Sequence, residues 1–352
     1  MKKFIAITLV VVLVLSMVGC GKGEKNEANE VNEANEANET QEKITLNLST
    51  PDPEDSSITA SAHEFAKRVK EKSNGTIEIT VHPNGTLYGG DPSAAVKQLG
   101  AGTIDMLFLS TLLYANFVPE FNAISIPYLF DDTDQLLAYL NGEPGQELLE
   151  KVGTLDIKGL GLWTRSFRQI TNSKLPITSP EDLKGLKLRV PNNPLWVEFF
   201  KNAGASPTPL AFGEVYNALQ LKTIDAQENP VDVPMSAKFY EVQKYLTISN
   251  HQADGWVVGM NSDKFEKLSD EHKQILMDVT EEVQDWKLDY DNKQDKEDIA
   301  ALQEKGMEVN ELDADSMKKF AEISKELFPT FKDLVKNDEF FQLTLEFVGK
   351  AN

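Results

Sequence analysis

The chain has 352 residues, of which 41% are hydrophobic and 26% charged, an ordinary globular composition that is long enough for two domains. Its formal net charge of −21 argues against nucleic acid, whose phosphates it would repel, and gives no attraction to anionic lipid headgroups. The single cysteine, Cys20, has no second cysteine to pair with, so an internal disulfide is excluded.

Residues 1–20 have the layout of a secretory signal, because two lysines near the start precede an apolar run that is too short to span a membrane comfortably. The run ends at Gly19-Cys20, which resembles a bacterial lipobox, where cleavage before the cysteine leaves it to carry diacylglycerol. Met17 departs from the more usual leucine. We predict a lipoprotein signal peptide over 1–20 with Cys20 as the lipid anchor. A buried free thiol in a signal-anchor helix is the alternative.

Residues 21–43 repeat the pattern Asn-Glu-Ala and contain almost no apolar side chains that could be buried. This composition predicts a disordered, acid-rich tether. Folding is expected to begin at Ile44, where apolar and polar residues start to alternate as they do in a strand.

The first folded segment predicts a strand, a helix and a second strand. Apolar residues alternate over 44–48 and again over 77–81, and residues 58–69 between them place apolar side chains at helical spacing. This order implies a parallel sheet and an α/β fold. In such sheets, ligands bind beyond the carboxyl ends of the strands.

Three strand ends of this segment are expected to converge on one edge. The loop 84–91 follows the second strand, Asp91 begins the next helix, and a buried strand over 104–109 ends at Ser110. The loop is rich in glycine, but no lysine follows the glycines, so we interpret it as a connection rather than a phosphate site. Asp91, Ser110 and Trp256 are candidate ligand contacts by position only, at strand or loop ends.

Arg189 lies in a predicted strand over 186–190, in which apolar residues alternate with basic ones. Helices are predicted over 194–202 and 212–221, and a short segment then leads to Asn229. A guanidinium held on this strand could bind a planar carboxylate through two parallel hydrogen bonds.

A long helix is predicted to begin after Ser269 and to continue without a break until Gly306. About 35 residues at 1.5 Å each give roughly 50 Å, which is more than one small domain needs. We therefore expect this helix to cross two domains. The residues after Asp313 predict two further helices that return to the second domain.

Several motifs occur in order: FRQITN at 167–172, DLKGLKLRVP at 182–191, GASPTP at 204–209, FGEVYNALQ at 212–220 and DAQENP at 225–230. With them, the chain resembles the extracytoplasmic solute-binding proteins of tripartite ATP-independent periplasmic (TRAP) transporters, the DctP family. The likeness is strongest from Trp163 to Gln243 and extends more weakly from about Ile44 to the C-terminus.

The resemblance implies an α/β, two-domain fold of the periplasmic-binding-protein type, with a ligand cleft between the domains and the long helix spanning both. Residues 44–165 and 254–293 are expected to form domain I, and residues 166–253 and 294–352 to form domain II. The segments that cross between the domains are expected to form a hinge.

The resemblance also assigns roles to residues. In the family, the arginine of the second motif binds the ligand carboxylate, which gives this role to Arg189. Arg168 resembles a second ligand arginine, with Arg165 as a nearby competitor and a structural salt bridge as the alternative. Phe212 resembles the aromatic residue that covers the ligand, with core packing as the alternative. Asn229 resembles an amide that hydrogen-bonds the ligand, with a turn cap as the alternative.

Asn192 lies just past the strand, where some relatives have another polar contact. Relatives that bind sialic acid have a glutamate where Ser110 aligns, so sialic acid is not favoured. The smaller carboxylates that stay open are sugar acids such as hexuronates, C4-dicarboxylates and 2-oxo acids.

No motif for catalysis or for a cofactor is visible. The histidines are scattered without metal-ligand spacing, and no glycine pattern of a dinucleotide site follows a strand. We expect no enzyme activity, no cofactor and no metal. A lipid-anchored hydrolase that acts on acidic sugars is the rival hypothesis, and an extracellular sensor domain is a third.

The protein expected from the sequence is an extracytoplasmic receptor, lipid-anchored to the outer face of the bacterial cell membrane or periplasmic. It would close its two domains around a small organic acid and present the closed form to the TRAP membrane permease subunits. It is expected to act as a monomer and to bind no nucleic acid.

Overall fold

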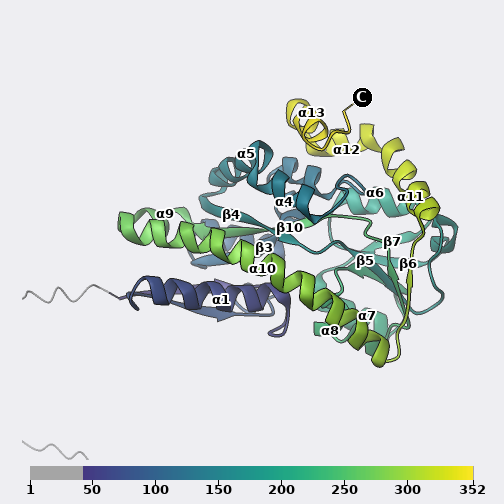
Figure 1. The fold of residues 1–352 in the computed structure, drawn as a ribbon, viewed down its shortest axis with the longest axis horizontal. Coiled ribbons are helices and arrows are strands. Elements are labelled where there is room, and N and C mark those ends of the chain that lie inside the picture. The colour runs from purple at the N-terminus through teal and green to yellow at the C-terminus, as the bar shows by residue number, and fades with distance from the viewer. Residues whose placement is uncertain (1–42, 352) are drawn as a thin grey trace, which may run out of the picture. The chain divides into compact units, whose positions relative to one another are not determined.

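The computed structural model describes residues 43–351, which form two β-sheets with helices packed around them (Figure 1). We call the part built on the first sheet domain I and the part built on the second sheet domain II. The predicted two-domain α/β fold is confirmed. The predictions of a signal peptide over 1–20, of Cys20 as lipid anchor and of a tether over 21–43 lie outside the described residues, except for Lys43.

The sheet of domain I mixes parallel and antiparallel pairs. In sheet order its strands are β2 (Ile77–His82), β1 (Ile44–Ser49), β3 (Met106–Ser110), β10 (Asp254–Asn261) and β4 (Ile157–Arg165). The pairs of β1 with β2 and β3 are parallel, as predicted, whereas β10 runs antiparallel to β3 and β4. The helices of domain I are α1 (Ser57–Lys72), α2 (Pro92–Gly100), α3 (Thr111–Tyr114), α4 (Thr133–Asn141), α5 (Glu143–Val152) and α9 (Ser262–Glu266).

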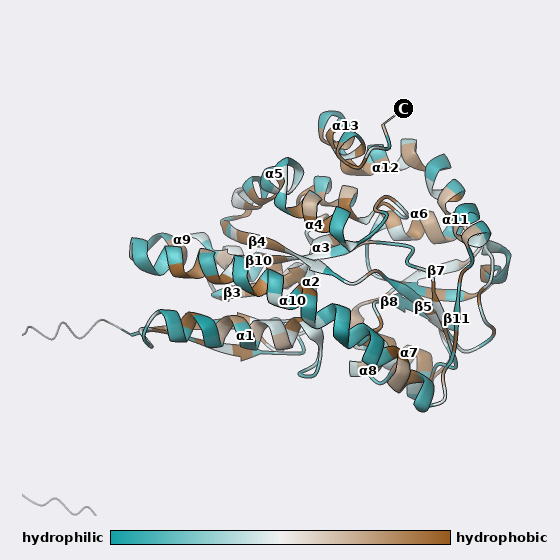
Figure 2. Ribbon diagram, in the orientation of Figure 1, coloured by the Kyte–Doolittle hydropathy of each residue, from teal (hydrophilic) through white to brown (hydrophobic). Residues whose placement is uncertain are grey.

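The core of domain I holds α1 against its sheet. Phe65 of α1, Phe108 of β3 and Trp163 of β4 are fully buried, and their ring centroids lie 4.9 to 6.2 Å apart. Such edge-to-face contacts stabilise a core beyond the area that they bury. Figure 2 shows the strands of this sheet largely in brown and white, as expected for buried strands.

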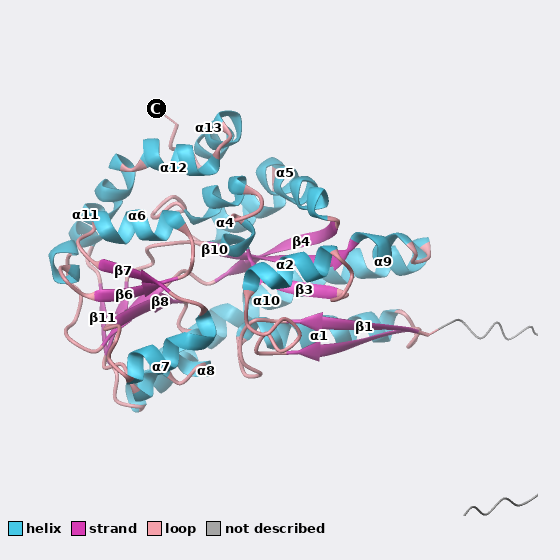
Figure 3. Cartoon of the chain, turned by 180° about the vertical axis from the view of Figure 1, so that it is seen from behind, coloured by secondary structure: helices cyan, strands magenta, loops and turns pink. Residues whose placement is uncertain are grey.

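The sheet of domain II is also mixed. In sheet order its strands are β11 (Glu308–Glu311), β9 (Tyr245–Ile248), β5 (Gln169–Asn172), β8 (Ala226–Asn229), β6 (Lys187–Val190) and β7 (Ser206–Pro209). Its helices include α6 (Pro194–Asn202), α7 (Val215–Gln220) and α8 (Asp232–Ser236). Figure 3 shows the two groups of strands from behind. The strand predicted around Arg189 is confirmed as β6.

Helix α10 (Asp270–Glu304) has 35 residues and contacts both domains. Its N-cap is Ser269, whose hydroxyl accepts a hydrogen bond from the His272 backbone N–H. It packs on α1 and β4 in domain I and on α8 and β11 in domain II, so the predicted domain-spanning helix is confirmed. Within residues 43–351, no helix is long and apolar enough to cross a membrane.

Two chain crossings between the domains lie side by side. One leads from β4 to β5 through Arg168, and the other leads from β9 to β10 through His251 and Gln252. The Arg168 backbone N–H donates to the Gln252 carbonyl at 3.0 Å, and the His251 N–H donates to the Arg168 carbonyl at 3.3 Å. The crossings therefore support each other at the boundary of the two domains.

Three helices follow β11, where the sequence predicted two: α11 (Ala314–Glu326), α12 (Phe328–Val335) and α13 (Asp338–Phe347). Leu327 separates α11 from α12, and Lys336, whose backbone is left-handed (φ 56°), ends α12 before Asn337 caps α13. Helix α11 contacts α6, whereas α12 and α13 contact the 3-10 helix η1 (Pro119–Ser125). The C-terminal helices thus touch elements on both sides of the domain boundary, and the exact domain limits stay a prediction.

Candidate functional site

A cavity of about 810 Å³ lies between the domains. Domain I lines it with residues that follow β1 and β2 and with the end of β3, so the predicted convergence of three strand ends is confirmed. Every side chain that the sequence assigned to ligand binding also lines it. These residues are Arg189, Arg168, Asn229, Phe212, Asn192, Asp91, Ser110 and Trp256.

Arg189 reaches this cavity from β6 without an acidic partner. The residue is 4% exposed, and its Nε and Nη2 donate to the Leu210 carbonyl at 3.0 and 2.7 Å. Among residues 43–351, no carboxylate oxygen lies within 4.0 Å of its guanidinium. Both bonds use one edge of the guanidinium, so the Nη1–Nη2 edge keeps two parallel N–H donors. Burial lowers the pKa of Arg189 to about 10, which leaves it cationic at neutral pH.

Arg168 is held by acids on almost every side. Its Nε donates to Glu228 Oε2 at 2.5 Å, its Nη1 to Asp254 Oδ2 at 3.3 Å, and its Nη2 to Asn229 Oδ1 at 2.9 Å. The side chains of Glu228 and Asp254 are 0% exposed. Burial would raise the pKa of Glu228, but the charge of Arg168 and the hydrogen bond from His251 outweigh it and lower that pKa to about 2. One N–H of Nη1 is left for another acceptor.

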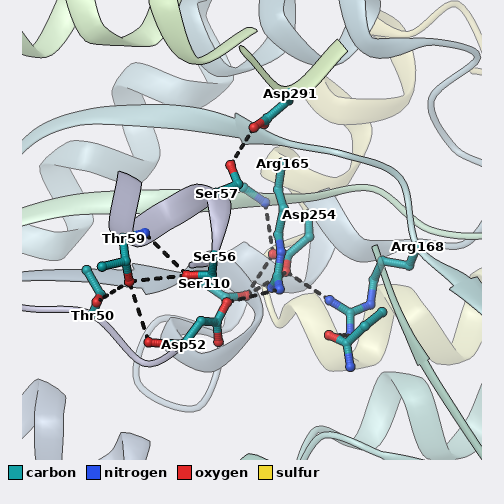
Figure 4. Close-up of polar contacts among 12 residues, drawn as sticks. Thr50, Asp52, Ser56, Ser57, Thr59, Ser110, Arg165, Arg168, Asp254 and Asp291 are labelled. Carbon is teal, nitrogen blue, oxygen red and sulfur yellow. Dashed lines mark hydrogen bonds and ion pairs between the residues drawn. The ribbon is translucent and has the colours of Figure 1, made fainter. Parts of the chain in front are cut away.

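Asp254 connects Arg168 to Arg165 and to domain I (Figure 4). Arg165 Nη1 donates to Asp254 Oδ2 at 3.1 Å, and the Ser110 hydroxyl lies 2.8 and 2.7 Å from the two Asp254 oxygens. The Arg165 guanidinium also lies 4.4 Å from the centre of the Trp256 ring. Because its proton bonds Asp254, Ser110 can offer a ligand only an acceptor. We call Arg165, Arg168, Glu228 and Asp254 the hinge network.

The predicted ligand contacts in domain II differ in how much of each side chain is engaged by other residues of the protein. Asn229 Nδ2 donates to Gln227 Oε1 at 2.7 Å and keeps one N–H, so its side chain bonds neighbours in the sheet rather than capping a turn. Phe212 is half-buried and packs near Phe239, with 6.2 Å between ring centroids, so it belongs both to a small core and to the cavity wall. Asn192 is exposed, and its carbonyl accepts a hydrogen bond from Asn116 at 3.4 Å.

Sequence reasoning missed Asp52 and Tyr88, which also line the cavity. Asp52 Oδ2 has no hydrogen-bond partner among the described residues and lies 3.6 Å from Arg165 Nη2. Burial raises its pKa to about 6 although Arg165 opposes the shift. Tyr88 Oη is likewise buried without a partner. The position of Asp52 just after the first strand is the signal that could have found it, since Ser110 was selected by the same rule.

A second cavity, of about 740 Å³, lies among α10, α11 and the crossing after β4. Arg165 lines both cavities, whereas none of the eight predicted contacts lines the second. Asp295 on its wall is partly buried, and burial raises the pKa of Asp295 to about 7. Within the part of the chain that the structure describes, no cluster of side chains has the composition of a metal site.

Two α/β domains that are joined by crossings and a spanning helix, with a charged cavity between them, define the class of two-domain solute-binding proteins. Residues 48–333 match the family described as bacterial extracellular solute-binding protein, family 7 (DctP). The chain therefore belongs to the DctP family, the solute-binding proteins of TRAP transporters, as the sequence motifs predicted. Proteins of this family bind solutes and are not enzymes.

Individual relatives show the same relationship. The chain is 36% identical over 259 residues to the 2,3-diketo-L-gulonate-binding periplasmic protein YiaO of Escherichia coli, covering 72% of this chain and 78% of the relative. It is 31% identical over 293 residues to the C4-dicarboxylate-binding protein DctB of Bacillus subtilis, covering 83% and 82%. A crystal structure of the sugar acid binding protein DctPAm from Advenella mimigardefordensis with galactonate has a TM-score of 0.84 at 30% identity, covering 88% of this chain and 99% of that one.

Proposed function

We propose that this protein is the extracytoplasmic receptor of a TRAP transporter and that Arg189 binds the carboxylate of its ligand, a small organic acid. The carrying observation is a buried guanidinium on the wall of the cavity between the domains, with no carboxylate of the described residues within 4.0 Å of it. A ligand carboxylate would supply the missing charge and accept two parallel hydrogen bonds from the Nη1–Nη2 edge.

The ligands named for relatives support this chemical class. A diketogulonate, C4-dicarboxylates and galactonate differ in length and substitution, but each carries a carboxylate. Sugar acids, C4-dicarboxylates and 2-oxo acids are therefore the compounds to test. The free N–H groups of Arg168 and Asn229 would donate to other ligand atoms.

The ligand would close the two domains around itself. Both domains line the cavity, so only the closed form can make all the contacts, and the two crossings with α10 would act as the hinge. The closed monomer would then dock on the permease subunits. Identical small-angle scattering curves with and without saturating ligand would contradict this closure.

We also propose that Cys20 carries a lipid that anchors the protein outside the cell membrane. Cys20→Ser should abolish lipid labelling and release the protein, while the soluble chain over 44–352 should keep its affinity. Unchanged membrane retention of the serine variant after signal cleavage would contradict the anchor.

The carboxylate role of Arg189 is tested by screening organic acids for thermal stabilisation and titrating the best one by calorimetry. A ligand at 100 times its dissociation constant adds about 2.7 kcal/mol of stability, which such a screen detects. Arg189→Ala should weaken binding by at least roughly tenfold to hundredfold, because a charge-assisted contact is lost. Arg189→Lys should restore little, since one ammonium cannot form two parallel bonds. An Arg189→Ala protein that binds as tightly as the parent would refute the proposal.

A further inference from the structure

Helix α8 of domain II brings a carboxyl group to the start of helix α1 of domain I. The group belongs to Asp232, which is 9% exposed and lines an internal space of about 10 Å³. Domain I and α10 supply the other charged walls and the start of α1, through Ser57, Arg165, Lys287, Asp291 and Asp295. A space of this size holds about one water molecule and is too small for a ligand, so these side chains face one another.

The two cations around this space already have acidic partners. Lys287 pairs with Asp291, and its Nζ donates to the Ser57 hydroxyl at 3.1 Å. Arg165 pairs with Asp254 at 3.1 Å. Figure 4 shows the bond between Ser57 and Asp291 near Arg165. Neither cation is therefore left over for a further acid.

Asp232 and Asp295 are acids without a paired cation. Among the described residues, no nitrogen of a basic side chain lies within 4.0 Å of either carboxyl group. Helix α8 also packs on the 3-10 helix η5 (Phe239–Glu241), whose one charged side chain, Glu241, is bonded to Tyr216 at the surface. The other titratable groups whose charge reaches Asp232 are all acidic: Asp52, Asp291, Asp298 and the Tyr290 phenol. A further buried negative charge among these acids is costly unless a proton neutralises it.

We propose that Asp232 is a positioning residue that makes closure of the domains, and with it ligand binding, depend on the uptake of a proton. This inference rests on the proposed function and adds to it a residue that does not line the ligand cavity. Closing brings α8 to the start of α1 and buries the Asp232 carboxyl group beside Asp291 and Asp295, whereas opening lets water reach it. Arg165 and Trp256 line both this space and the ligand cavity, so the two are neighbours.

The direction of the effect follows from burial. Burial raises the pKa of Asp232, Arg165 and Lys287 oppose this rise, and Asp291 adds to it. The closed form therefore holds the proton more tightly than a form in which water reaches the carboxyl group. Closing takes up a proton, so Asp232 should make ligand affinity rise as the pH falls from 7.5 to 5.5, by at most about tenfold per pH unit.

Calorimetry counts these protons. The tightest organic acid is titrated at pH 6.5 in two buffers that differ in enthalpy of ionisation, and the difference in binding heat gives the number of protons taken up. The parent should take up more protons than Asp232→Asn or Asp232→Ser, since neither replacement can bind one. Asp232→Asn should bind the acid about three- to tenfold tighter than the parent at pH 7.5, because its amide needs no proton on closing. Protons that the ligand itself binds cancel in this comparison.

The matched control is Asp298→Asn. Asp298 is also buried, and burial raises its pKa to about 6. Its Oδ1 accepts a bond at 2.9 Å from Gln294 of its own helix, however, and it does not line the space beside Asp232. Asp298→Asn should alter the pH dependence of melting of the empty protein but take up as many protons on ligand binding as the parent.

Two results would overturn the inference: equal proton uptake by the parent and both variants at Asp232, or an affinity of Asp232→Asn at pH 7.5 that is no higher than that of the parent. Either result, obtained with a ligand whose binding depends on Arg189, leaves the proposed function intact. If no organic acid binds the parent, both fail.

Discussion

The hinge network and Arg189 are two ways of burying an arginine in one protein. In the network, Arg168 meets Glu228 and Asp254, and these acids raise its pKa even though burial would lower it. Among the residues that the structure describes, Arg189 donates hydrogen bonds only to the Leu210 carbonyl, and burial lowers its pKa. Burial is therefore common to both, and the counter-charge is what differs. A buried cation that lacks one indicates a site for an anion.

The largest expected effect is the loss of stability when the hinge network is broken. Arg168→Met leaves Glu228 and Asp254 buried with less counter-charge, so unfolding should cost about 3–5 kcal/mol less than in the parent. Arg189→Met removes an unpaired charge and should change the stability of the empty protein by no more than about 1 kcal/mol. Urea unfolding of both variants without ligand measures the difference.

If Arg168→Met and Arg189→Met destabilise the protein equally, the proposed difference between a charge-paired and an unpaired buried arginine is wrong. A double variant sharpens it further. Adding Glu228→Gln to Arg168→Met removes one of the orphaned acids, so part of the lost stability should return. No recovery would show that packing around Arg168, rather than its charge, dominates.

A smaller effect concerns acids outside the network. Burial raises the pKa of Asp295 to about 7 and those of Asp52 and Asp298 to about 6. Between about pH 4 and 7 these three carboxyls bind more protons in the folded protein than in the unfolded chain, so the stability that they contribute falls as the pH rises through that range. Burial lowers the pKa of His251 from 6.5, which acts in the opposite direction and makes the net change smaller. Melting of the empty protein should show it more stable at pH 5 than at pH 7.5, by of order 1–2 kcal/mol.

A variant at Asp295 is the control for this pH dependence, and the trend holds only above about pH 4. Asp295→Asn resembles the protonated acid and should flatten the profile, since it removes the group with the highest of the three pKa values. Below about pH 4 the trend should reverse, because Glu228 in the unfolded chain then takes up a proton, whereas in the folded protein its pKa near 2 keeps it ionised beside Arg168. A parent protein that is more stable at pH 7.5 than at pH 5 would contradict this account.

Much of the fold could be predicted because local sequence patterns determine its strands and helices. Alternation identified β1, β2 and the strand that carries Arg189, a serine cap and an unbroken pattern identified α10, and ordered motifs identified the family. The sequence predicted two helices after Asp313 where the structure has three, and the break between α12 and α13 depends on a left-handed Lys336 that no glycine or proline marks.

The site could be predicted less completely, because the hydrogen-bond and ion-pair partners of its residues lie far apart in the sequence and meet only in the folded sheets. Arg168 finds Glu228 and Asp254 from 60 and 86 positions away, so no local pattern shows that its donors are nearly all used. Likewise, only the folded structure shows that Asp52 Oδ2 has no hydrogen-bond partner among the described residues. The sequence can name charged residues near a cleft, but which of them is left unpaired depends on the folded arrangement.

The most direct test of the central claim compares one ligand in two forms, on two proteins. The tightest acid from the screen and its primary amide differ by a charge while keeping nearly the same shape. Calorimetry at pH 7.5 should show that the parent prefers the acid by about a hundredfold or more, as expected for a charge-assisted pair in a buried site. Arg189→Met should bind both weakly and with almost no preference between them. If Arg189→Met keeps the full preference for the acid, another residue binds the carboxylate, and the role given to Arg189 is wrong.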